Sequence, residues 1–142
     1  MKKMNNKGFS LVELIIVIAI MAVLVGILAP QYLKYVNNSK VSTDISNAEQ
    51  IATTINVAVS DSDTANLGTT VPTGTASATW TLSKGDTIYD DGSRTVLAPD
   101  CSHKAGASWV VTWDTVNGVT KITCQGTDIW PDADPYNTAY KK

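Results

Sequence analysis

The chain has 142 residues, a length typical of one domain, with eleven basic and thirteen acidic side chains and a net charge of −2. Only 17% of the residues are charged, whereas 44% are apolar. The mildly acidic balance argues against a broad nucleic-acid-binding surface, two cysteines are too few for a Cys₄ zinc site, and one histidine excludes a multi-histidine metal centre.

The chain begins with a short basic segment, residues 1–8, which contains three lysines. A nearly unbroken apolar run follows at residues 9–29. As a helix this run spans roughly 31 Å, which is enough to cross the hydrocarbon core of a bilayer. Because the lysines precede the run, they predict a cytoplasmic N-terminus and export of the remainder of the chain.

Glu13 is the one ionisable side chain in this apolar run. A carboxylate in hydrocarbon costs several kcal/mol unless it is neutralised or paired, and a plain membrane anchor gains nothing from it. A secretory signal peptide is also disfavoured, because its apolar stretch is shorter and ends in a small-residue cleavage site. If the chain is cut after Gly8, Phe9 acquires a charged α-amine four residues from Glu13 on the same helix face. Glu13 can then pair with this amine or with that of a neighbouring copy.

Residues 7–13, Lys-Gly-Phe-Ser-Leu-Val-Glu, together with the apolar run and Pro30, resemble the type IV pilin family. The resemblance implies that a prepilin peptidase cuts between Gly8 and Phe9 and N-methylates Phe9. It also implies that Glu13 neutralises the Phe9 amine of the adjacent subunit during assembly. Pro30 lies where the family has a helix-breaking proline, which removes one hydrogen bond of the helix.

The same resemblance implies a structural subunit without a cofactor rather than an enzyme. The expected partners are further copies in a helical filament, the prepilin peptidase, minor pilins and the pilus assembly platform in the cytoplasmic membrane. We expect no specific nucleic-acid binding by the monomer. The precursor is expected to span the cytoplasmic membrane once with its N-terminus inside, and the assembled form to be an extracellular pilus that serves adhesion, motility or DNA uptake. Two alternatives stay open: a type II secretion or competence pseudopilin, and, from another class, a signal-anchored surface binding domain.

Beyond Pro30 the sequence becomes amphipathic. Apolar residues recur in steps of three and four, which predicts one buried stripe on a helix that continues to about residue 60. These residues are Val41, Ile45, Ala48, Ala52, Ile55 and Val59. Polar side chains, Asp44 among them, are assigned to the other faces. We expect the stripe to pack on the chain's own C-terminal domain; a separate coiled-coil partner is the alternative.

Residues 61–142 predict a β-rich domain. Residues 61–78 have the composition of a loop, and five short strands are expected after it, at residues 80–82, 87–89, 94–98, 108–114 and 119–124. Asn117-Gly118 predicts a hairpin with a type I′ turn between the last two. The fold class is therefore α+β: a leader at 1–8, a long N-terminal α-helix at 9–60 with an apolar part at 9–29 and an amphipathic part at 30–60, and a small C-terminal antiparallel β-sheet packed on it.

Cys101 and Cys124 lie 23 positions apart in the part that would be exported. Paired cysteines usually bond in an oxidising compartment, and the resemblance also implies a bridge near the C-terminus. Two free thiols are the alternative. Cys101-Ser-His103 places a thiol near the imidazole, but nothing in the sequence supplies the orienting group of a thiol protease.

Three aspartates near the C-terminus, Asp128, Asp132 and Asp134, are weak candidates for a calcium site, since calcium prefers oxygen ligands. The spacing of an EF-hand is absent, and two prolines in this region are typical of turns. We therefore expect no metal.

Overall fold

The computed structural model describes residues 8–60, 67–68, 78–103, 106–114 and 116–141. It divides into two compact units, an N-terminal unit of residues 1–36 and a C-terminal unit of residues 37–142. Helix α1 (Leu11–Ser60) contributes to both units. Apart from Gly8, the predicted leader lies outside the described residues, as does most of the loop predicted at 61–78.

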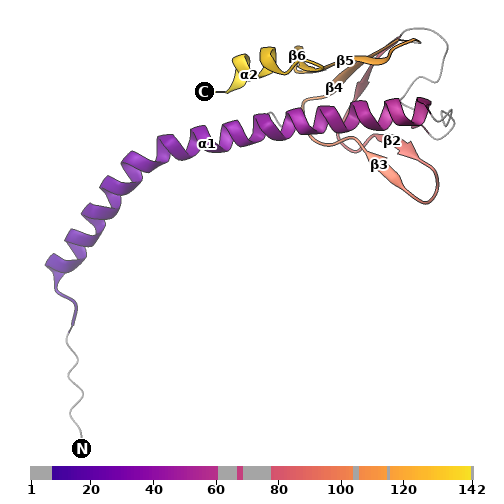
Figure 1. The fold of residues 1–142 in the computed structure, drawn as a ribbon. Coiled ribbons are helices and arrows are strands. Elements are labelled where there is room, and N and C mark those ends of the chain that lie inside the picture. Colours follow the sequence, from indigo (N-terminus) through magenta and orange to yellow (C-terminus); the bar gives the residue numbers. More distant parts are fainter. Residues whose placement is uncertain (1–7, 61–66, 69–77, 104–105, 115, 142) are drawn as a thin grey trace, which may run out of the picture. The chain divides into compact units, whose positions relative to one another are not determined.

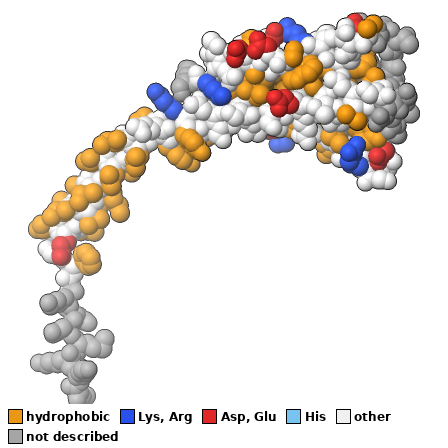
Figure 2. All heavy atoms as spheres, viewed as in Figure 1, with side chains coloured by type: hydrophobic (Ala, Val, Ile, Leu, Met, Phe, Trp, Pro, Cys, Tyr) orange, Lys and Arg blue, Asp and Glu red, His pale blue; other side chains and the backbone are white. Residues whose placement is uncertain are grey.

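In the N-terminal unit, helix α1 has no buried side. Every described residue up to Tyr35 is exposed within the chain, and Figure 2 shows apolar side chains gathered along this part of the helix. The helix is long and apolar enough to cross a membrane, and its most apolar stretch is 0% buried. Apolar side chains all round a helix indicate burial in lipid or in other protein chains, because water is an unfavourable environment for them.

In the C-terminal unit, the same helix is one-sided, as predicted. Its buried residues are Val41, Asp44, Ala48, Ile51, Ala52, Ile55 and Ala58, and Ile45 and Val59 pack against the core while partly buried. The stripe packs on the chain's own sheet, as expected. One assignment was wrong: Asp44, placed on a polar face, is completely buried.

The main sheet of the C-terminal unit has four antiparallel strands in the order β1-β4-β5-β6. These are β1 (Ala78–Leu82), β4 (Trp109–Asp114), β5 (Gly118–Cys124) and β6 (Thr127–Trp130). Strands β2 (Thr87–Asp90) and β3 (Thr95–Leu97) form a separate antiparallel pair. The helix and strands of this unit are drawn in Figure 1, and the α+β class is confirmed.

Alternation along β4 shows why the sheet buries one face. Trp109, Val111 and Trp113 are buried, whereas the residues between them are only partly covered. Val111 pairs with Ile122 of β5, which is also buried. Side chains two residues apart lie on the same face of a strand, so this pattern places two tryptophans in the core beneath the helix stripe.

Two elements were missed by sequence analysis, strand β6 and the short helix α2 (Asp134–Tyr140). A two-residue turn with positive φ at both Gln125 and Gly126 joins β5 to β6, which is the geometry that was expected at Asn117-Gly118. The β4–β5 hairpin forms as predicted, but among its described turn residues only Gly118 has a positive φ. Its turn is therefore not type I′; the Asp114 Oδ1 accepts hydrogen bonds from the backbone N–H groups of Val116 and Asn117 instead.

Candidate functional site

The start of helix α1 is a capping box. Ser10 precedes the first helical residue, and its Oγ accepts a hydrogen bond from the Val12 N–H at 3.3 Å. The Glu13 Oε2 accepts one from the Ser10 N–H at 2.9 Å. These side chains satisfy N–H groups that have no partner within the helix, which favours helix formation from this point.

The capping role of Glu13 was missed by sequence analysis. The signal was present, because a serine followed three residues later by a glutamate, just before an apolar run, is the sequence pattern of this cap. Its consequence is that the Glu13 carboxylate has a partner within its own chain. Any pairing with an amine of another copy competes with that hydrogen bond.

Phe9 and Glu13 are both exposed, and Phe9 retains 85% of its accessible surface. Gly8 has open space around it, since a Cβ added there would meet no other atom within 4 Å. The peptide bond between Gly8 and Phe9 thus lies just before the helix, next to exposed side chains. Extended or irregular backbone outside a helix is the kind of segment that a peptidase can bind and cut.

Pro30 lies inside helix α1, which continues on both sides of it. Proline has no N–H to donate to the carbonyl of Gly26, and its ring crowds the preceding turn. Gly26 lowers helix propensity further, and a Cβ at that position would meet no other atom within 4 Å. This turn is therefore intrinsically weaker than the aliphatic turns before it.

The C-terminal unit contains a buried polar cluster around Asp44. Its Oδ1 accepts a hydrogen bond from the Ser102 N–H, and its Oδ2 accepts one from the His103 N–H at 3.0 Å and one from the Tyr136 hydroxyl at 2.8 Å. A buried carboxylate is costly unless donors surround it, and this one has donors from two segments distant in the sequence. It joins helix α1 to the loop after Cys101 and to helix α2.

The disulfide lies directly against this cluster. Cys101 and Cys124 are bonded, with a Sγ–Sγ distance of 1.96 Å, and both residues are fully buried. The Tyr136 hydroxyl lies 3.7 Å from each sulfur. Burial is the main cause that raises the pKa of Tyr136 well above its usual range, and the hydrogen bond to Asp44 is the second cause. The hydroxyl therefore remains protonated. Since Cys101 is oxidised, it supplies no thiolate for the nucleophilic chemistry considered for Cys101 and His103.

The C-terminal aspartates have roles of their own in the described structure. Asp128 forms an ion pair with Lys121 at 2.8 Å, and the Asp132 Oδ1 accepts a hydrogen bond from the Asp134 N–H at the start of helix α2. Among the described residues, no three His, Cys, Asp or Glu side chains are grouped as metal ligands. The ion pair joins the neighbouring strands β5 and β6, and the hydrogen bond lies at the start of helix α2.

Comparisons with known proteins find similarity over part of the chain. Residues 3–29 match the family model described as the prokaryotic N-terminal methylation motif. A type IV major fimbrial protein FimA of Dichelobacter nodosus is 44% identical over 59 residues, which is 42% of this chain and 38% of that protein. Over these stretches the chain is similar to type IV pilins, in agreement with the resemblance at residues 7–13.

Two further type IV major fimbrial proteins FimA of Dichelobacter nodosus are each 42% identical to this chain over 59 residues. The match covers 42% of this chain in both cases and 38% and 37% of the relatives. The match with this chain thus spans well under half the length of these curated relatives. No solved structure matches this chain.

Proposed function

We propose that this protein is a pilin, the structural subunit of a type IV pilus. It is made as a precursor that spans the cytoplasmic membrane, with its N-terminus inside. A prepilin peptidase cleaves it after Gly8 and N-methylates Phe9. The assembly platform then polymerises it, together with minor pilins, into a surface filament used for adhesion, motility or DNA uptake.

The observation that carries this proposal is the exposed apolar helix with an acid near its start. The apolar side chains between Phe9 and Tyr35 are exposed in the described part of the N-terminal unit. Lipid can cover them before assembly, and the equivalent helices of other copies can cover them in a filament. Parallel packing of many such helices would bury this apolar surface, which explains why an exported protein carries it.

In this proposal, Glu13 sets the position of each copy along its neighbours in the bundle. Within a low-dielectric bundle, a carboxylate and an amine attract each other strongly, and either one left unpaired is costly. After cleavage, the charged amine of Phe9 is the nearest cation to the start of the helix. An incoming copy is positioned when its amine meets a Glu13 already in the bundle, and the capping hydrogen bond from Ser10 is given up or shared.

Processing by the peptidase tests the proposal most simply. The full-length chain is expressed with an active prepilin peptidase and, as a matched control, with a catalytically inactive one. Intact mass with N-terminal fragmentation is expected to show a chain that begins at N-methylated Phe9 only with the active enzyme. A chain that still begins at Met1 beside the active enzyme would contradict the proposal and favour a signal-anchored surface domain.

A further inference from the structure

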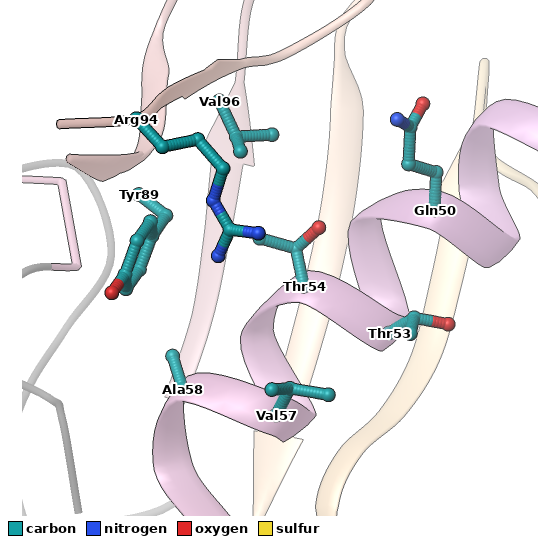
Figure 3. Close-up of a pocket in the computed structure, with 8 residues that line it drawn as sticks. All are labelled: Gln50, Thr53, Thr54, Val57, Ala58, Tyr89, Arg94 and Val96. Carbon is teal, nitrogen blue, oxygen red and sulfur yellow. The ribbon is translucent and has the colours of Figure 1, made fainter. Parts of the chain in front are cut away.

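A pocket of about 370 Å³ lies in the C-terminal unit between helix α1 and the β2–β3 pair. Its volume falls near the lower end of the range of small-molecule sites, about 300–1,000 Å³. Figure 3 shows Arg94 extending from the segment before β3, with its guanidinium between the Tyr89 ring and Thr54. No step of filament assembly proposed above uses this pocket.

The guanidinium of Arg94 is held against an aromatic ring and attracts the Asp91 carboxylate without forming an ion pair with it. It lies over the Tyr89 ring, 5.2 Å from the ring centroid, in a cation–π contact. Among the residues that the structure describes, no carboxylate forms an ion pair with it. An arginine presents a planar fork of donors, and this fork is available to a ligand that enters the pocket.

Asp91, three residues before Arg94, accepts hydrogen bonds from other donors. Its Oδ1 accepts the backbone N–H groups of Ser93 at 2.8 Å and Arg94 at 2.7 Å, and its Oδ2 accepts the Tyr89 hydroxyl at 3.3 Å. The backbone hydrogen bond from Arg94, and next the one from Ser93, lower the pKa of the Asp91 carboxyl. Asp91 therefore accepts these hydrogen bonds as a carboxylate anion. It shapes the hairpin and holds Tyr89, while the side chain of Arg94 extends into the pocket.

The opposite wall comes from helix α1 and has two kinds of surface. Thr53 and Thr54 bring hydroxyl groups, and Gln50 brings an amide. Val57 and Val96 add aliphatic surface nearby. A ligand that fits both kinds of surface carries hydroxyl groups and C–H faces on a compact body, together with an anionic group for the arginine.

We propose that this pocket binds an acidic monosaccharide, with its carboxylate paired to Arg94 in a bidentate fashion and its hydroxyl groups hydrogen-bonded to the threonines of helix α1. A carboxylate matches the planar geometry of the guanidinium, and a charged pair of this kind gives both affinity and orientation. The sugar ring is small enough for the pocket and presents hydroxyl groups toward Thr53 and Thr54. This inference does not depend on filament assembly.

The test uses the full-length, isotope-labelled pilin in detergent micelles, titrated with glucuronate while the Nε–Hε NMR signal of Arg94 is followed. Glucose, acetate and inorganic phosphate are titrated in parallel. We expect glucuronate to shift the signal saturably, glucose to leave it unchanged, and acetate and phosphate to act only at much higher concentration. Equal binding of glucose, or tighter binding of phosphate, would overturn the proposal, and equal binding of acetate would overturn the assignment to a sugar.

Two variants and a control locate the binding. Arg94→Gln is followed through the Thr54 amide and is expected to weaken glucuronate binding about tenfold or more, since a charged hydrogen-bonded pair contributes about 1.5–3 kcal/mol. Thr54→Val is expected to weaken it a few-fold. Lys40→Gln removes the same charge from an exposed position of helix α1 outside the pocket and is expected to change nothing. If Lys40→Gln weakened binding as much as Arg94→Gln, the effect would be general electrostatics and the pocket assignment would be wrong.

Discussion

Helix α1 contains two regions that differ in how their apolar side chains are covered. Residues 11–35 are apolar almost throughout and exposed throughout, whereas residues 41–58 bury a single stripe against the sheet of their own unit. The difference arises from periodicity, because an amphipathic helix can be covered by one sheet and a uniformly apolar helix cannot. The comparison teaches that the first region has its partners outside the chain and the second has them inside.

The largest expected effect comes from a charge in the first region. Ile18→Lys is predicted to disfavour membrane insertion by about 3 kcal/mol, because a lysine near the centre of a spanning helix is expensive. Less of the variant is expected in washed membranes, while the unfolding midpoint of the C-terminal unit stays the same. Ser42→Lys, at an exposed position of the second region, is the matched control.

The unfolding midpoints of the Ile18→Lys and Ser42→Lys variants can be compared directly by tryptophan fluorescence. All four tryptophans lie in the C-terminal unit, so their fluorescence reports on that unit alone. Normal insertion of Ile18→Lys, or a large fall in its fluorescence midpoint, would remove the distinction between the two regions.

The disulfide is the next largest test, and it acts on the second region only. The double variant Cys101→Ser/Cys124→Ser is predicted to lower the free energy of unfolding by roughly 3 kcal/mol, since the bridge closes a loop with a sequence separation of 23. Urea unfolding followed by tryptophan fluorescence measures this. The wild-type protein under reducing conditions should unfold at the same urea concentration as the variant, and an unchanged midpoint in both would contradict the prediction.

The buried acid of the second region is expected to matter somewhat less. Asp44→Asn places an amide against donors from Ser102, His103 and Tyr136, and the loss of the carboxylate is predicted to cost about 2 kcal/mol. Glu49→Gln removes a carboxylate from an exposed position of the same helix and should change the free energy of unfolding very little. Equal effects of the two variants would mean that the cluster contributes nothing specific.

The smallest effect is a pH dependence from the same cluster. Burial and the bond to Asp44 raise the pKa of Tyr136 in the folded state, so its contribution is present below the unfolded pKa of about 10 and lost as pH rises above it. The decline is expected to reach about 1.4 kcal/mol per pH unit. Unfolding curves measured between neutral and alkaline pH should show this decline in the wild type and less of it in Tyr136→Phe. A decline that is identical in both would mean that Tyr136 ionises freely.

The sequence predicted the elements that depend on local patterns. The helix stripe followed from steps of three and four residues, and strand β4 followed from alternation around Trp109, Val111 and Trp113. Both patterns reflect burial of one face, which the sequence records directly. The resemblance of residues 7–13 to the type IV pilin family was also evident from residue types alone, and residues 3–29 match the N-terminal methylation motif.

The sequence did not predict features that depend on distant partners. Asp44 occupies a stripe position, three residues after Val41, but an aspartate there looks solvent-exposed until its donors 58 to 92 residues away are known. The pocket at Arg94 depends in the same way on contact between a hairpin and helix α1. Helix α2 was missed although Pro135 near its start was a signal, because seven residues are too few for a periodicity.

The central claim is that the first region assembles copies through Glu13 while the second region only holds each copy together. The most direct measurement is the yield of filaments sheared from cells that express the wild type, Glu13→Gln, Glu49→Gln or Ser10→Ala. We predict that Glu13→Gln abolishes filaments, that Glu49→Gln leaves the yield unchanged, and that Ser10→Ala, which removes the cap but keeps the acid, retains most of it. A normal yield from Glu13→Gln would contradict the account, and an equal loss from Ser10→Ala would assign the effect to helix capping rather than to pairing between copies.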